Sequence, residues 1–213
     1  MITTTFKTDN IDKTKTLIQP EIKFPNYRVG LLGGAFNPPH IGHLIIGEQV
    51  GTQLGLSKVY FMPNNISPIK GKQIINSDDR VQMVNKSIAK NSLFDIELSE
   101  VNRSGKSYAY DTLVKLKKQH PHNEYYFIIG ADEVINLPNW YKIDELLKLV
   151  TFVGVGRPNY KKVSDYPILW VDVPQLDISS TMIRNKIKNH QSIKYFVTDG
   201  VEKYIKEHKL YSE

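Results

Sequence analysis

Paired glycines, paired prolines and two histidines stand within the eleven residues GGAFNPPHIGH, which run from Gly33 to His43. Such a stretch suits three kinds of chemistry: a metal site, a catalytic base, or backbone that lies against phosphate groups. Gly33 and Gly34 have no Cβ, so a ligand can approach their backbone and a positive φ is accessible there. Pro38 and Pro39 fix φ and favour an extended path toward the next helix.

A helix that begins near His40 would direct its first N–H groups and its dipole toward the end of the preceding strand, which favours an anion. His40 and His43 are three residues apart, so they share one face of the first turn, and Gly42 leaves the surface between them open. Two imidazoles in this place suit a polyphosphate whose charge shifts during a reaction. A zinc pair is disfavoured, because helical zinc pairs are usually four residues apart with an acid nearby. The alternative to a polyphosphate site is a glycine turn whose two histidines lie on the surface and bind no ligand.

The stretch ISSTMIR, residues 178–184, is a second candidate anion site. Its hydroxyl side chains can cap a helix whose exposed N–H groups bind phosphate. Arg184 lies one turn further on and adds a planar guanidinium that can hold phosphate oxygens. The alternative is a well-capped helix that carries a solvated arginine.

Short apolar runs alternate with amphipathic stretches from Tyr27 onward, which predicts strands alternating with helices. We predict strands at 27–32, 58–62, 94–98, 125–129, 151–155 and 168–171. We predict helices at 40–54, 77–89, 110–119, 132–137, 143–149, 180–188 and 201–209. This pattern is typical of an α/β fold, a Rossmann-like, doubly wound, mostly parallel sheet with helices on both faces.

Ligands of such sheets bind outside the carboxyl ends of the strands. Polar loops follow five of the predicted strands at that edge: 33–40, 63–70, 103–112, 130–132 and 177–184. We therefore expect one site that is assembled from these five loops.

The composition is that of an ordinary soluble globular protein. The 213 residues include 40% hydrophobic side chains, which suffices for a core of one large domain. The absence of cysteine excludes disulfides, thiolate zinc sites and cysteine nucleophiles and fits a reducing compartment, so we expect a cytoplasmic protein. A formal net charge of +6 permits anionic partners.

The chain shows no apolar run of the roughly 18 residues that a membrane span needs. Its Thr/Lys-rich start lacks the apolar segment of a secretory signal. We expect residues 1–26 to form a weakly ordered N-terminal extension and residues 27–213 to form a single domain.

GGAFNPPHIGH together with ISSTMIR resembles the nucleotidylyltransferase superfamily, which carries an HxGH motif and an (S/T)xxxR-type motif near the C-terminus. The further stretches SYAYDT, IIGAD and NWY resemble the bacterial nicotinate-nucleotide adenylyltransferases in particular. The resemblance extends roughly from Val29 to Tyr211, and five motifs in this order are highly specific. It implies adenylyl transfer from ATP to nicotinate mononucleotide, which gives deamido-NAD and pyrophosphate in NAD biosynthesis.

The chemistry of that reaction agrees with the residues at the expected site. A phosphate monoester has a second pKa near 6, so the attacking group is mostly dianionic at pH 7 without help from a base. The protein has to bring two anions together and stabilise charge on the α-phosphate and the leaving pyrophosphate. This explains why the loops offer no Ser-His-Asp arrangement and no carboxylate pair.

By resemblance, His40, His43 and Arg184 are the catalytic residues, with His43 nearest the reacting phosphate. The residues that the resemblance assigns to ATP are Gly33, Gly34, Phe36, Lys70, Gly130, Asp132, Ile178, Ser179, Ser180 and Thr181. Those assigned to the mononucleotide are Asn37, Tyr108, Thr112, Trp140 and Tyr141. Mg²⁺ would be held mainly by ATP oxygens, and no protein metal site is expected because no acidic cage is visible.

The sequence departs from the family pattern at two positions. Ile69 stands where the family more commonly has histidine before Lys70, so a contact from an imidazole is missing there. Ala109 replaces the hydroxyl residue of the family's SYTxDT stretch, so a hydrogen bond to the mononucleotide is lost or supplied by Thr112. The segment 136–141 precedes a predicted helix near Ile143, and its N–H groups are candidates to bind the nicotinate carboxylate.

Three rival functions remain open. The first is a sister adenylyltransferase that uses nicotinamide mononucleotide or phosphopantetheine. The second is a catalytically silent sensor of an NAD precursor. The presence of both histidines and Arg184 argues against this function. The third is a nucleic-acid binder, which would need a clustered basic face rather than scattered lysines. We expect small-molecule nucleotides as partners, neither nucleic acid nor membrane, and a homodimer stays open.

Overall fold

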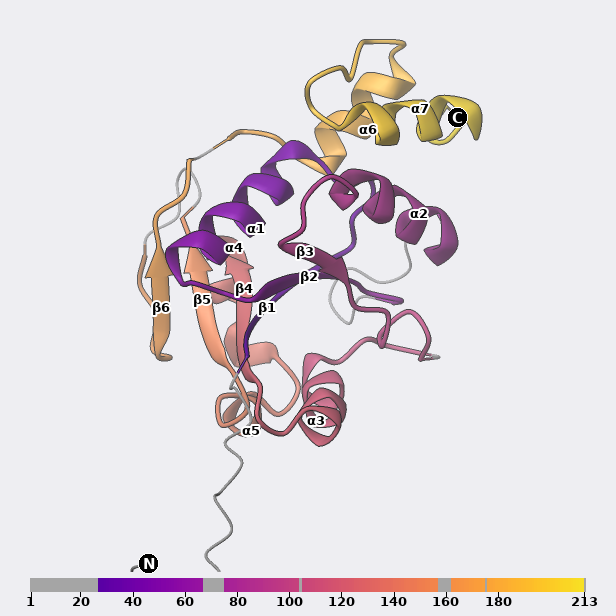
Figure 1. Ribbon diagram of the computed structural model, residues 1–213. Helices are drawn as coiled ribbons and strands as arrows, with labels where there is room; N and C mark the ends of the chain where they lie inside the picture. The colour runs from indigo at the N-terminus through magenta and orange to yellow at the C-terminus, as the bar shows by residue number, and fades with distance from the viewer. Residues whose placement is uncertain (1–26, 67–74, 104, 157–161, 175, 213) are drawn as a thin grey trace, which may run out of the picture.

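The computed structural model describes residues 27–66, 75–103, 105–156, 162–174 and 176–212. Six strands form one sheet in the order β3-β2-β1-β4-β5-β6, and every neighbouring pair is parallel (Figure 1). The strands are β1 (Arg28–Gly34), β2 (Lys58–Pro63), β3 (Phe94–Ile96), β4 (Glu124–Gly130), β5 (Thr151–Val155) and β6 (Ile168–Val171). This confirms the predicted doubly wound α/β fold. The N-terminal extension expected at 1–26 lies outside the described residues.

Helices cover both faces of the sheet, with α1 and α2 on one side and α3 and α5 on the other (Figure 1). The helices are α1 (Ile41–Gln53), α2 (Ser77–Ile88), α3 (Ala109–Gln119), α4 (Ala131–Val134), α5 (Ile143–Leu146), α6 (Ser180–Lys188) and α7 (Asp199–Glu207). Because α1, α2, α3 and α5 face the sheet with apolar side chains, the central strands are buried on both faces.

The helix predicted at 132–137 is divided in the structure. It ends at Val134, and a short 3-10 helix, η1 (Leu137–Asn139), follows. Pro138 explains the break, since proline has no N–H to donate and disfavours the α conformation of the residue before it. The other predicted elements exist, with ends that differ by up to three residues.

Alternation along β1 shows how one strand serves two cores. Val29 and Leu31 pack on the side of α3 and α5, whereas Leu32 packs on the side of α1 and α2. Successive side chains of a strand point to opposite faces, so an unbroken apolar run supplies both. This packing holds β1 rigidly at the centre of the sheet.

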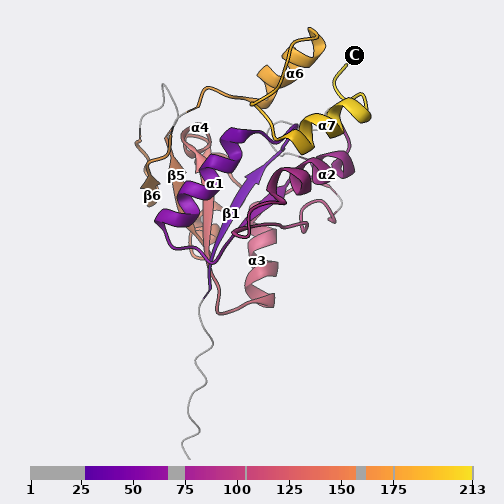
Figure 2. The same cartoon turned by 45° about the horizontal axis from the view of Figure 1, so that its top comes forward.

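The C-terminal helices α6 and α7 form a third cluster with α2. Met83 of α2 packs there with Ile183 of α6 and Val201 of α7, all three fully buried. Tyr204 adds a hydrogen bond from its hydroxyl to Oδ1 of Asp79, 2.8 Å long. Figure 2 shows α7 beside α2 and α6 beyond the end of α1, at the side of the molecule to which β1 points.

Candidate active site

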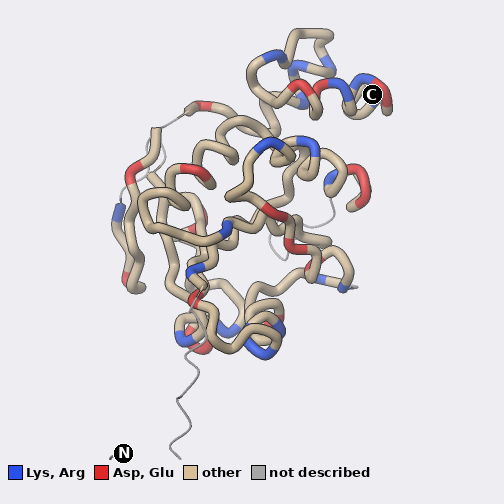
Figure 3. The backbone as a smooth tube through the Cα atoms, viewed as in Figure 1, with Lys and Arg blue, Asp and Glu red and all other residues tan. Residues whose placement is uncertain are grey.

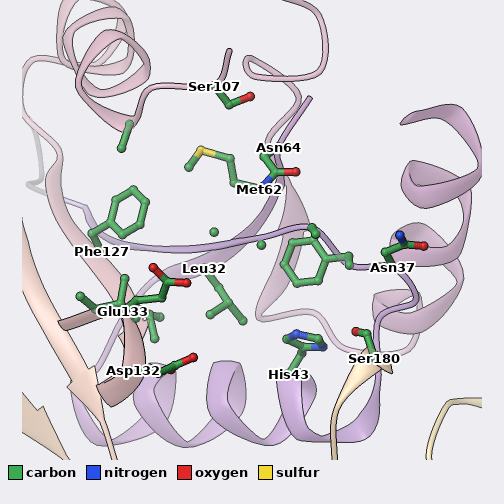
Figure 4. Close-up of a pocket in the computed structure, with 18 of the residues that line it drawn as sticks. Leu32, Asn37, His43, Met62, Asn64, Ser107, Phe127, Asp132, Glu133 and Ser180 are labelled. Carbon is green, nitrogen blue, oxygen red and sulfur yellow. The ribbon is translucent and has the colours of Figure 1, made fainter. Parts of the chain in front are cut away.

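A cavity of about 950 Å³ opens at the carboxyl ends of β1 and β4, where the strand order reverses direction (Figure 4). Residues from all five predicted polar loops line it. The predicted site residues among them are Gly33, Gly34, Phe36, Asn37, His40, His43, Tyr108, Gly130, Asp132, Trp140, Tyr141, Ser179, Ser180, Thr181 and Arg184. Segments that are up to about 150 residues apart in the sequence therefore meet in one site, as the topology predicts.

The turn after β1 differs from the expected glycine turn. Gly33 and Gly34 continue the strand, and the left-handed residue is Phe36, with φ of 48°. Phe36 is only 1% exposed, and its ring packs edge-on against the ring of His43 with 5.0 Å between centroids. The missing Cβ of Gly34 still matters, because a Cβ there would lie 3.1 Å from the Phe36 ring.

The start of α1 has fewer available N–H groups than the sequence suggests. The N–H of Ile41 donates to the carbonyl of Phe196 in the C-terminal segment, 2.9 Å away. The N–H of His43 donates to the carbonyl of His40, and the N–H of His40 donates to Nδ1 of His43 at 3.1 Å. The expected anion site at this helix therefore depends on side chains more than on free backbone donors.

The bond to Nδ1 determines how His43 can act. A neutral imidazole that accepts a hydrogen bond at Nδ1 carries its proton on Nε2. His43 lines the cavity (Figure 4), so its imidazole lies where a bound ligand could meet it. His40 is 6% exposed, and its ring centroid lies 3.7 Å from that of His43. A Cβ on Gly42 would lie 3.0 Å from Nδ1 of His40, so glycine makes room for this pair of rings.

The start of α6 is joined to the turn after β1. Ser180 donates from Oγ to the carbonyl of Pro38 at 2.8 Å, and Arg184 donates from Nη1 to the carbonyl of Asn37 at 2.8 Å. Nη2 of Arg184 also donates to Oγ1 of Thr181, 3.0 Å away. The two candidate anion sites of the sequence are therefore parts of one structure.

Capping of α6 agrees with the prediction that its hydroxyl residues close the helix. Ser179 is the N-cap, and its Oγ accepts the N–H of Met182 at 3.2 Å. This leaves the hydroxyls of Ser180 and Thr181 and the guanidinium of Arg184 at the wall of the cavity.

Aromatic side chains form the other end of the cavity. Tyr108 and Tyr141 lie with ring centroids 4.8 Å apart, and Trp140 packs edge-on against Phe127 at 5.6 Å. Nζ of Lys142 lies 5.3 Å from the Tyr141 ring centroid and adds a positive charge. Flat rings with a cation beside them suit an anionic aromatic ligand.

The proposed backbone donors for a carboxylate in segment 136–141 are partly used by the chain itself. The N–H of Asn139 donates to the carbonyl of Asn136, and that of Trp140 to the carbonyl of Leu137. Both N–H groups donate to backbone carbonyls at η1, so the expectation that they bind a carboxylate was wrong.

Three predicted residues are not part of the described cavity wall. Lys70 lies outside the described residues. Ile178 packs against the C-terminal cluster of α2, α6 and α7. Thr112 is fully buried, and its Oγ1 lies 3.4 Å from two acceptors for its single proton, Oε1 of Glu100 and the carbonyl of Tyr108. Their roles stay predictions.

Glu100 lines the cavity and was not recognised from the sequence. Its side chain is 5% exposed, and burial raises its pKa to about 7, although hydrogen bonds from Ser107 and Thr112 and the charge of Arg103 oppose the rise. A glutamate in a polar loop gives no signal of burial in a single sequence, because the burial depends on how the loop folds over it. The other cavity residues that the sequence did not single out include Met62, Asn64, Lys106, Ser107 and Glu133.

Some alternatives are disfavoured within the described part of the chain. No group of three or more histidine and acidic side chains there could hold a metal ion. None of the helices in the described ranges is long and apolar enough to cross a membrane. In Figure 3 lysine and arginine are spread over the tube among acidic residues.

Comparison with known proteins adds independent findings. Residues 31–186 match the family described as cytidylyltransferase-like. The chain is 51% identical over 208 residues to the probable nicotinate-nucleotide adenylyltransferase of Lactiplantibacillus plantarum, covering 97% of this chain and 99% of that protein. It is 44% identical over 185 residues to the nicotinate-nucleotide adenylyltransferase of Bacillus subtilis, covering 86% of this chain and 98% of that protein.

Among solved structures, the fold is similar to that of the Plasmodium falciparum nicotinic acid mononucleotide adenylyltransferase complexed with NaAD. The TM-score is 0.74 at 20% sequence identity, and the match covers 87% of this chain and 98% of that one. At this identity the likeness supports the fold.

Proposed function

The chain belongs to the cytidylyltransferase-like family and, within it, to the nicotinate-nucleotide adenylyltransferases, and from this premise we propose which of its residues carry out the reaction. The enzyme transfers the adenylyl group of ATP to nicotinate mononucleotide in NAD biosynthesis. The observation that carries our assignment is the shared cavity of His43, Ser180 and Arg184 at the carboxyl ends of β1 and β4.

We assign the ATP phosphates to the region between the turn after β1 and the start of α6. The backbone at Gly33 and Gly34 gives close access, and Thr181 and Arg184 supply a hydroxyl and a guanidinium for the β- and γ-phosphates. The ribose and adenine would lie toward Gly130 and Asp132 at the end of β4. Phe36 would support the phosphate site through the His43 ring that it touches.

His43 is assigned to the reacting phosphate. Its Nε2–H can donate to an α-phosphate oxygen whose negative charge grows as the mononucleotide phosphate attacks. The attacking phosphate is already a dianion near neutral pH, so none of the surrounding residues has to remove a proton. The work of the site is positioning and charge stabilisation, with His40 holding the His43 ring.

The mononucleotide is assigned to the aromatic end of the cavity. Trp140 and Tyr141 offer ring faces to the pyridine, Tyr108 lies beside them, and Asn37 lies toward the phosphates. Lys142 lies against the Tyr141 ring and favours a nicotinate carboxylate over a neutral amide. Ala109 lines the cavity without a hydroxyl, so the mononucleotide contact that the family makes there has to come from a neighbour.

Mg²⁺ fits this site as a partner of ATP rather than as a resident metal. Asp132 and Glu133 line the cavity, but the described residues contain no group of three potential ligands. A hard cation that keeps several waters and binds mainly to phosphate oxygens agrees with this donor set. When bound, it would neutralise charge on the phosphates. A reaction that uses ATP also agrees with a cytoplasmic enzyme. The partners of the enzyme are nucleotides. A homodimer stays a proposal.

Substitution of His43 tests the assignment. His43→Ala should lower kcat by about 10²–10³-fold with a small change in KM for ATP, because a donor aimed at the transition state is lost. Pyrophosphate release with ATP, Mg²⁺ and nicotinate mononucleotide measures this. His120→Ala, which removes an exposed imidazole before the amino end of β4, is the matched control and should retain full activity. Normal turnover by His43→Ala would exclude the proposed role.

A further inference from the structure

Hydrogen-bond donors from other segments of the chain hold the turn Ala35–Pro38, which follows β1. Three of them bind backbone carbonyls of the turn, one from α2 and two from α6. They are Nη1 of Arg80 on the carbonyl of Ala35, Nη1 of Arg184 on the carbonyl of Asn37, and Oγ of Ser180 on the carbonyl of Pro38, each 2.8 Å long. The turn is therefore held from both sides by other segments of the chain.

A fourth donor comes from the very end of the described chain. The hydroxyl of Tyr211 donates to Oδ1 of Asn37 over 2.6 Å, although the two residues are 174 positions apart. The Tyr211 ring packs against the cluster of α2, α6 and α7. Burial raises the pKa of the Tyr211 hydroxyl well above its ordinary value, so the group stays protonated and remains a donor.

The held turn is the part of the site that needs such support. Asn37 is 3% exposed and follows Phe36, which adopts a left-handed φ of 48° that is uncommon for a bulky residue. Such a conformation persists only where its surroundings enforce it. The Phe36 ring lies against the His43 ring, so the shape of the turn is transmitted to the imidazole.

We propose that Tyr211 is a positioning residue for the transfer reaction, which fixes the turn Ala35–Pro38 through Asn37 and thereby the ring of His43. The proposal rests on the assigned role of His43 in the proposed function. It makes the C-terminal end of the chain part of the active site without any contact of its own with a substrate.

A purely structural role for Tyr211 predicts a different outcome, and the chain offers a matched comparison. Tyr204 lies in the same C-terminal cluster, is 8% exposed, and donates its hydroxyl to Asp79 of α2 over 2.8 Å. Both hydroxyls thus anchor the C-terminal segment, but only that of Tyr211 reaches the turn. Tyr204→Phe is therefore the control for loss of an anchoring hydrogen bond.

The experiment compares Tyr211→Phe with Tyr204→Phe in the full-length protein, because phenylalanine keeps the ring packing in both. Tyr211→Phe should lower kcat about 5-fold or more, with less than a twofold change in KM for either substrate. Tyr204→Phe should keep kcat within twofold of wild type, whereas melting temperatures should fall by similar small amounts in the two variants. Unchanged kcat in Tyr211→Phe, or an equal loss in both variants, overturns the proposal.

A double-mutant cycle tests the route through Asn37. If Tyr211 acts through Asn37, the double variant Asn37→Ala/Tyr211→Phe should lose no more kcat than Asn37→Ala alone. Multiplied losses would mean that Tyr211 acts elsewhere and would overturn the proposal. Failure of the assigned function is distinguishable, since it would appear as an unaffected His43→Ala variant or as absent wild-type activity.

Discussion

Glu100 allows a prediction whose magnitude follows from the structure. This carboxyl is 5% exposed, lines the cavity and contacts Thr112 across 3.4 Å. Burial raises its pKa from 4.5 to about 7, so the folded protein disfavours the ionised form. Glu100→Gln keeps the size and the accepting oxygen of the side chain but removes the charge that burial penalises.

The sign and size of the effect follow from proton linkage. Between about pH 4.5 and pH 7 the folded protein binds more protons at Glu100 than the unfolded chain does, so the free energy of unfolding falls as the pH rises through this range. One pKa unit corresponds to 1.36 kcal/mol, which gives an order-of-magnitude cost of about 3 kcal/mol above pH 7. Glu100→Gln should therefore be the more stable protein at pH 8, by up to roughly 6–12 °C in melting temperature. The difference should shrink toward pH 4.5.

Thermal unfolding of both proteins without ligands, at intervals from pH 4.5 to pH 8, measures this difference. Asp165→Asn, which neutralises an exposed carboxyl, is the control and should follow the wild-type curve within experimental error. A Glu100→Gln variant that is less stable than wild type at pH 8, or a difference that does not vary with pH, would refute the reasoning. The first result would mean that the ionised form makes strong contacts that outweigh its burial.

Two further predictions concern the chain end and the metal. Deletion of residues 1–24 should leave the melting temperature and kcat/KM nearly unchanged, because the apolar side chains of this segment are scattered among Thr and Lys; a large loss in either would show that it packs on the domain. Removal of Mg²⁺ with EDTA should abolish pyrophosphate release yet leave the ligand-free melting temperature unchanged, since the proposed ion is bound by ATP oxygens. A fall in that melting temperature would indicate a metal held by the protein itself.

The sheet could be predicted from the sequence because its signals are local. Each strand is a short apolar run bounded by polar loops, and the alternation with helices makes a parallel sheet the simplest arrangement. Ligands bind at the carboxyl ends of such strands, so the sequence predicts that His43, Asp132 and Arg184 share one site. All three line the cavity.

What could not be predicted depends on contacts between distant segments. The carbonyl of Phe196 occupies the N–H of Ile41, and the left-handed residue of the turn is Phe36 rather than a glycine. Neither fact has a local signal: the first is a contact with a segment about 150 residues away, and the second is a conformation that the sequence favours for glycine rather than for a bulky residue. The burial of Glu100 has another origin, since its partners Arg103, Ser107 and Thr112 lie in the segment that follows it and depend on how that segment folds.

Substrate preference is the most direct test of the account. The steady-state kcat/KM should be measured by pyrophosphate release with ATP and Mg²⁺, for nicotinate mononucleotide and nicotinamide mononucleotide separately. The two differ by a carboxylate against a neutral amide. Tyr141 lines the aromatic end of the cavity, and the exposed Lys142 sets its charge against the Tyr141 ring from outside the cavity wall. We predict a preference for nicotinate mononucleotide of about 10²-fold or more, since a mismatched polar group costs a few kcal/mol. Equal values, or a preference for the amide, would contradict both the assigned site and the assigned substrate.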